Sequence, residues 1–72
     1  MKLPQLKPRE VISALKRLGF VEIRTSGSHV RLIDDHGRRV TVPKHSGDTP
    51  KGTLRSILRQ AEITVQDLLD EI

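Results

Sequence analysis

The strongest constraint on the fold is a run of three short segments, residues 21–25, 29–33 and 38–42, in which apolar and polar residues alternate. Successive side chains of a strand point to opposite faces, so each segment predicts a strand with one buried face. Turn-forming residues separate the segments, Ser-Gly-Ser at 26–28 and Asp-Asp-His-Gly at 34–37. Strands joined by such short turns pair antiparallel. We therefore expect a three-stranded antiparallel sheet that Pro43 ends.

The segments on either side of the strands have the apolar spacing of helices. Pro8 is tolerated at the first helical position, and Gly19 supplies the left-handed residue that ends the first helix. We expect Asp48 or Thr49 to cap a second helix and Thr64 to cap a short third one. The predicted buried positions are Val11, Ile12, Leu15 and Leu18, then Leu54, Ile57, Leu58 and Ala61, then Val65, Leu68, Leu69 and Ile72.

This order of elements predicts an α+β fold in which helices cover one face of the sheet, an arrangement also found in double-stranded-RNA-binding domains. Residues 1–72 are expected to form a single domain that buries only about 60% of its unfolded surface, so any active site must be shallow. The absence of cysteine excludes disulfides and thiolate metal sites and fits the cytoplasm. No apolar run approaches the ~20 residues of a membrane span, and the first residues lack a signal-peptide core.

Positive charge is concentrated in most of the chain. Residues 1–61 hold all 13 Lys and Arg against 5 acidic residues, a net +8, whereas residues 62–72 hold four acidic residues and no base. A basic body of this kind favours a polyanionic ligand, although basic charge can also serve solubility. The acidic end is either a solvated helix face or a mask over the basic surface.

Alternation assigns side chains to the two faces of the sheet. The covered face is predicted to hold Val21, Ile23, Val30, Leu32, Val40 and Val42. The open face is predicted to hold Glu22, Arg24, His29, Arg31, Arg39 and Thr41. Histidine takes and gives protons near neutral pH, and arginine matches phosphate oxygens. His29 among three arginines therefore predicts chemistry on a phosphodiester, the alternative being an ordinary polar residue on a wet face.

Other polar residues have weaker claims to function. Ser28 either contacts substrate or only makes the turn, and we favour the turn. His45 is either a second proton-transfer group or a loop-stabilising hydrogen-bond partner, whereas His36 lies in the hairpin turn and is expected to be a bystander. The three histidines lack helical i, i+4 spacing and acidic neighbours at ligand spacing, so we expect no metal and no cofactor.

A basic stripe is expected along the second helix, because Lys51, Arg55 and Arg59 recur every four residues. Together with Lys44, such a stripe can follow a phosphate backbone, although a solvated helix face has the same pattern. Phe20, the only aromatic residue, is expected in the core. Recognition of RNA would therefore rely on charge, shape and arginine planes rather than on aromatic stacking.

Four motifs, in order, resemble the HicA family of toxin ribonucleases over roughly residues 7–66: Gly19-Phe20, Gly27-Ser28-His29, Val42-Pro43-Lys44-His45 and the segment 52–61. The chain departs from the family at Leu32, where an aromatic residue is usual. The resemblance implies a double-stranded-RNA-binding-domain-like fold and a metal-independent endoribonuclease that cleaves mRNA. It further implies His29 as the catalytic general acid/base and a HicB-type antitoxin that covers the active face.

The main alternative is a non-catalytic double-stranded RNA-binding module, in which His29 only contacts a phosphate or a 2′-hydroxyl. A DNA-binding protein is a weaker alternative, because no recognition helix follows a short helix-to-helix turn.

Overall fold

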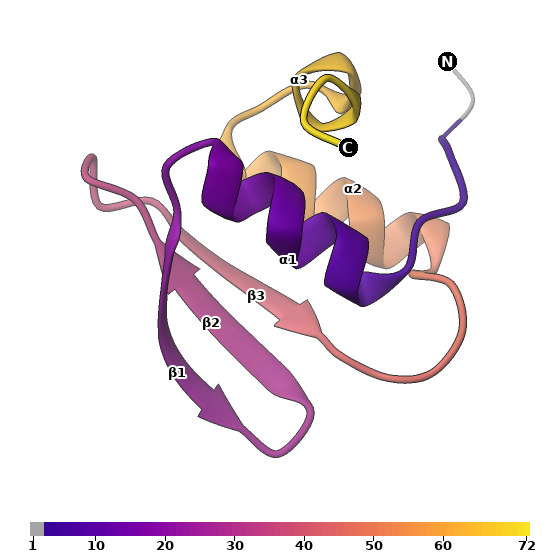
Figure 1. Cartoon of the computed structure of the whole chain (residues 1–72), viewed down its shortest axis with the longest axis horizontal. Coiled ribbons are helices and arrows are strands. Elements are labelled where there is room, and N and C mark those ends of the chain that lie inside the picture. The colour runs from indigo at the N-terminus through magenta and orange to yellow at the C-terminus, as the bar shows by residue number, and fades with distance from the viewer. Residues whose placement is uncertain (1–2) are drawn as a thin grey trace.

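The computed structural model describes residues 3–72 and has the predicted order of elements (Figure 1). The elements are α1 (Pro8–Arg17), β1 (Val21–Ser26), β2 (His29–Ile33), β3 (Arg39–Pro43), α2 (Lys51–Ala61) and α3 (Val65–Leu69). The strands form one antiparallel sheet in the order β1-β2-β3. No helix within residues 3–72 combines the length and the apolar character that crossing a membrane requires.

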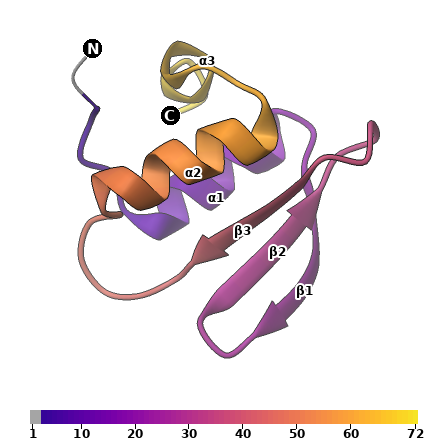
Figure 2. The ribbon, with the colours of Figure 1, turned by 180° about the vertical axis from the view of Figure 1, so that it is seen from behind.

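The fold has two layers, which confirms the predicted α+β class. Helices α1 and α2 lie over the same face of the sheet, and α3 packs on the far side of them, away from the strands (Figures 1 and 2). The Arg17 guanidinium at the end of α1 donates to the Glu71 carbonyl at 2.6 Å, which ties the C-terminus to the helix layer. The opposite face of the sheet has no covering element in the described chain.

The core lies between the helices and two of the three strands, β2 and β3. Both α1 and α2 contact β3, and Leu32 is fully buried. The alternation in β2 and β3 therefore has the predicted phase. The buried apolar residues are Leu6, Val11, Ile12, Ala14, Leu15, Phe20, Val30, Leu32, Val40, Val42, Leu54, Ile57, Ala61, Val65 and Leu68.

The end of α1 is built as the sequence predicts. Gly19 has φ of 104°, a conformation that costs glycine little. The Gly19 N–H donates to the Lys16 carbonyl at 3.1 Å, and the Phe20 N–H donates to the Leu15 carbonyl at 3.0 Å. These two bonds satisfy carbonyls that the helix end would leave unpaired. They also direct Phe20 into the core and start β1.

The two predicted caps have different outcomes. Thr64 caps α3 as expected, because its hydroxyl accepts the Asp67 N–H at 3.0 Å and the Asp67 carboxylate accepts the Thr64 N–H at 2.9 Å. The cap predicted for α2 is wrong, since Pro50 occupies the N-cap position without a side-chain hydrogen bond. The backbone N–H of Thr49 donates instead to the Leu6 carbonyl at 2.7 Å, and the Thr49 residue is buried.

The predicted apolar positions at the C-terminus differ in burial. The predicted apolar positions Val65 and Leu68 are buried, whereas Ile72 is 50% exposed. Helix α3 ends at Leu69, so the helical spacing that would have turned Ile72 inward stops before it.

Strand β1 contains a bulge. Val21 and Glu22 pair with Ile33 and Leu32, but the register shifts by one residue before Arg24, which leaves Ile23 without a partner on β2. An extra residue of this kind bends the strand and reverses the alternation on one side of the bulge. The start of β1 therefore has the opposite phase from the one predicted for it.

This reversal corrects three side-chain assignments. Val21 and Ile23 were expected in the core and are instead 63% and 53% exposed. Glu22 was expected on the open face, but it lies opposite Leu32 and therefore on the helix side. The position of β1 also contributes to the exposure of its apolar residues. The helices cover β2 and β3, while β1 projects beyond them (Figure 2).

The hairpin between β2 and β3 is held by one carboxylate. Oδ1 of Asp34 accepts the backbone N–H of His36 at 3.0 Å and that of Arg38 at 2.8 Å. Oδ2 of Asp34 lies 3.6 Å from Arg38 Nε, and the Arg38 guanidinium also donates to the Ala61 carbonyl at 3.5 Å. The hairpin is thereby linked to the end of α2.

We expect the Asp34→Ala variant to lose about 1–3 kcal/mol of unfolding free energy, because two backbone N–H groups and Arg38 lose a largely buried partner. Asp35→Ala is the matched control: its side chain is 90% exposed, so the change should stay within about 0.5 kcal/mol. Urea unfolding followed by circular dichroism measures both. Equal stability of the two variants would contradict this role for Asp34.

Candidate functional site

The open face of the sheet carries the histidine and arginines that the sequence predicts for it. His29 begins β2, is exposed, and lies opposite Ser26 on β1 and Pro43 on β3. Two residues further on, Arg31 lies between Arg24 on one side and Thr41 on the other. Arg39 shares this face, because it pairs with Ile33, which alternates with the buried Leu32.

A shallow hollow of about 280 Å³ lies on this face. Its lining includes all three arginines, so a ligand in it would be surrounded by guanidinium groups. The side chains of Leu32 and Val40 are buried, so these two residues line the hollow with backbone atoms. The lining residues are Ile23, Arg24, Arg31, Leu32, Arg39, Val40 and Thr41. His29 is not among them and stands on the same face, two residues before Arg31.

The electrostatics of the open face favour an anion. Arg24 and Arg31 are directly opposite each other, and like charges in that position destabilise a sheet. No strand residue in the described chain places a carboxylate on this face, because the bulge turns Glu22 to the helix side. A bound phosphate would offset the repulsion, since arginine matches phosphate oxygens in a bidentate geometry.

Glu22 has its own partners on the helix side. Its carboxylate accepts a hydrogen bond from the Thr25 hydroxyl at 2.6 Å and lies 3.4 Å from Lys16 Nζ. The Thr25 hydrogen bond and then Lys16 hold the pKa of the Glu22 carboxyl below its ordinary value of 4.5. The lining of the groove between α1 and β1 comprises Arg9, Ile12, Ser13, Lys16, Glu22, Thr25, Val30 and Lys44.

Ser28 and Lys44 are joined through the backbone, because the Lys44 N–H donates to the Ser28 carbonyl. This bond extends the pairing of β2 and β3 by one step and is consistent with the turn role favoured for Ser28. Lys44 lines the groove between α1 and β1 and a second hollow beside the start of α1. It therefore lies apart from the hollow that the three arginines line.

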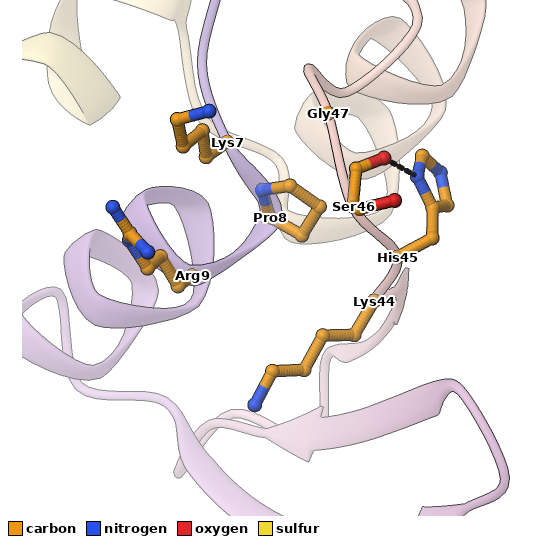
Figure 3. Close-up of a pocket in the computed structure, with 7 residues that line it drawn as sticks. All are labelled: Lys7, Pro8, Arg9, Lys44, His45, Ser46 and Gly47. Carbon is orange, nitrogen blue, oxygen red and sulfur yellow. Dashed lines mark hydrogen bonds between the residues drawn. The ribbon is translucent and has the colours of Figure 1, made fainter.

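His45 lines that second hollow, of about 280 Å³, with Lys7, Pro8 and Arg9 (Figure 3). Its Nδ1 lies 3.0 Å from the Ser46 carbonyl oxygen. With Nδ1–H donating to this carbonyl, Nε2 is left free to exchange a proton. In Figure 3 the ring turns back onto Ser46, away from Lys7 and Arg9. The loop-stabilising contact is thus present, and a catalytic role for His45 stays a prediction.

The basic stripe of α2 lies on the helix layer. Lys51, Arg55 and Arg59 are all exposed, and the Arg59 guanidinium donates to the Ser56 hydroxyl at 3.4 Å. Helix α2 covers the other face of the sheet (Figure 2), whereas the strand register places His29 on the open face, so the stripe and His29 belong to different layers. Helix α3, with the acidic residues in and beside it, packs on the far side of α1 and α2, so it does not cover the open face (Figure 1).

One expectation about metal ligands is wrong. His36 does have acidic neighbours, because Asp34, Asp35 and His36 bring one ligand atom each within 4.8 Å of one another in the hairpin turn. The physical reason is the turn itself, which Asp34 forms by accepting two backbone N–H groups. His36 Nδ1 lies 3.1 Å from the exposed Asp35 carboxylate. These contacts account for the cluster as turn chemistry.

A small α+β protein with a histidine and three arginines on an open sheet face has the charge distribution of a nucleic-acid-binding domain. The comparison with protein families identifies the family. The family described as the HicA toxin of bacterial toxin–antitoxin systems matches residues 8–63, and the chain belongs to this family. The match includes α1, the whole sheet and α2. No curated protein matches the chain.

We expect the Thr25→Val variant to have a higher Glu22 pKa, because it loses the hydrogen bond that most lowers that pKa. A lowered folded-state pKa stabilises the protein above the unfolded pKa, and this contribution is lost as the pH falls through the folded value. The variant should therefore lose less stability than the native chain on acidification below about pH 4.5. NMR titration of the Glu22 carboxyl, with Thr41→Val as the control, tests this; an unchanged pKa in Thr25→Val would refute it.

Proposed function

We propose that this HicA-family toxin is a metal-independent endoribonuclease that cleaves mRNA, with His29 as a general acid/base. The observation that carries the proposal is the exposed position of His29 on a sheet face with three arginines and no strand carboxylate. The family match supports it. The activity would take place in the cytoplasm, where mRNA is translated.

The chemistry follows from what RNA offers. His29 takes the proton of a 2′-hydroxyl, whose oxygen attacks the adjacent phosphorus. The bond from the 2′-oxygen to phosphorus forms, the bond from phosphorus to the 5′-oxygen breaks, and a 2′,3′-cyclic phosphate results. The leaving 5′-oxygen takes a proton from His45 or from the now protonated His29. Arginine side chains stabilise the charge that develops on the phosphate oxygens.

Two sets of basic residues would hold the RNA. Arg24, Arg31 and Arg39 contact the phosphates nearest His29, because they share its face. The remaining basic residues extend the contact over the phosphate backbone and add affinity without sequence preference. These residues are Lys44, Lys51, Arg55 and Arg59. Ser28 makes the turn that presents His29 at the start of β2.

We further propose a HicB-type antitoxin as the partner. A toxin of this family needs an inhibitor in its own cell. The open face is basic and carries His29, so it is the surface that such an inhibitor would cover. An antitoxin with acidic groups would associate quickly and in a salt-sensitive way with such a face. Covering His29 would block RNA directly, without a conformational change in the toxin.

A second candidate function is a non-catalytic double-stranded RNA-binding module. One observation favours it, namely that the exposed stripe of Lys51, Arg55 and Arg59 lies on α2, whereas His29 lies on the open face of the sheet. Such a module would bind RNA through shape and phosphate contacts and leave it intact.

We expect His29→Ala to fold normally and to cleave RNA about 10²–10⁴-fold more slowly, the usual cost of losing one proton-transfer group. The assay uses single-stranded RNA in excess EDTA, and the products should end in a 2′,3′-cyclic or 3′-phosphate. His36→Ala is the matched control, because His36 is also exposed but lies in the hairpin turn. Full activity of His29→Ala, or a strict requirement for magnesium, would overturn the proposed mechanism.

A further inference from the structure

Ile23 is an apolar side chain in an unusual place. The bulge in β1 turns it onto the open face, where it is 53% exposed and lines the hollow with Arg24, Arg31 and Arg39. In this hollow an exposed apolar surface lies directly beside three guanidinium groups, so a ligand would meet both. Its position therefore points to a ligand with an apolar surface next to its negative charge.

The bulge also determines the charge of this hollow. Without the extra residue, alternation would place Glu22 on the open face and Ile23 in the core. With it, Glu22 is bonded to Thr25 and Lys16 on the helix side, and the hollow contains cations and no carboxylate. The same feature thus supplies an apolar wall and removes a negative charge.

Thr41 supplies a polar group on the opposite side of the hollow. Its backbone N–H is already taken, because it donates to the Gln60 side chain at 3.0 Å. The side-chain hydroxyl lies on the open face beside Arg31. A hydroxyl can both donate and accept a hydrogen bond, so it can meet the edge of any base.

We propose that this hollow binds one nucleobase of the RNA substrate, next to the phosphodiester on which His29 acts, with Ile23 as its apolar wall. The inference deepens the proposed function and rests on it. A nucleotide has the required combination of a flat apolar face, polar edges and an adjacent phosphate. The volume of about 280 Å³ is at the small end of small-ligand sites, roughly 300–1,000 Å³, which suits one base.

The test measures RNA binding in the His29→Ala background, so that the RNA stays uncut. The probes are a short single-stranded RNA and an abasic ribose-phosphate oligomer of the same length, each followed by fluorescence anisotropy. Ile23→Ala should weaken RNA binding about fivefold to tenfold, from the loss of apolar contact, and leave the abasic oligomer unaffected. Ile23→Val should retain most of the affinity.

Two controls separate the apolar contact from charge and from folding. Val21→Ala removes a more exposed apolar side chain on the same strand and face, outside the hollow, and should bind RNA as before. Arg24→Gln should reduce the salt dependence of binding, whereas Ile23→Ala should weaken binding by the same factor at every salt concentration. Both Val21 and Ile23 are more than half exposed, so neither truncation removes a core contact.

Native affinity in Ile23→Ala would overturn the inference. An equal loss for RNA and for the abasic oligomer would also overturn it, because the hollow would then recognise only the backbone. A base-dependent loss in Ile23→Ala would support the pocket even if the native chain failed to cleave RNA. In that case the proposed ribonuclease activity would be refuted, whereas the nucleobase site would still be supported.

Discussion

The packing of α1 and α2 onto the apolar face of β2 and β3 determines which side chains of the sheet stay exposed. Val30, Leu32, Val40 and Val42 are buried against the helices, and the pleat of a strand then sends the alternate side chains to the other face. A slip of one residue in β2 would bury Arg31 and expose Leu32, which strongly specifies the register. The position of His29 on an open surface is therefore a consequence of the core.

The helices do not extend over β1, and this limit shapes the candidate site. A strand that no helix covers can accommodate a bulge, because no core contact fixes the phase of Val21 to Ile23. The bulge brings an apolar side chain to the arginines of the open face and takes Glu22 away to Lys16 and Thr25. The result is a hollow that combines positive charge with one apolar wall, on the same face as His29.

Much of this could be predicted from the sequence, and the failures have physical causes. The phases of β2 and β3 were correct because both strands alternate and both are buried by helices. The phase at the start of β1 was wrong, because a bulge depends on pairing with β2 and leaves no mark in an alternating segment. Ile23 was therefore missed as a site residue. The α2 cap was wrong because Thr49 bonds to Leu6, a contact distant in sequence.

If RNA binds on the open sheet face that carries His29, the side chains of that face should report it. An NMR titration of the native chain tests this with single-stranded RNA whose 2′-hydroxyls are methylated, so that none can attack. We expect shifts in the His29 ring, the Ile23 methyl groups and the Nε–H signals of Arg24, Arg31 and Arg39. Shifts confined to Lys51, Arg55 and Arg59 would contradict this expectation and would favour the non-catalytic RNA-binding module.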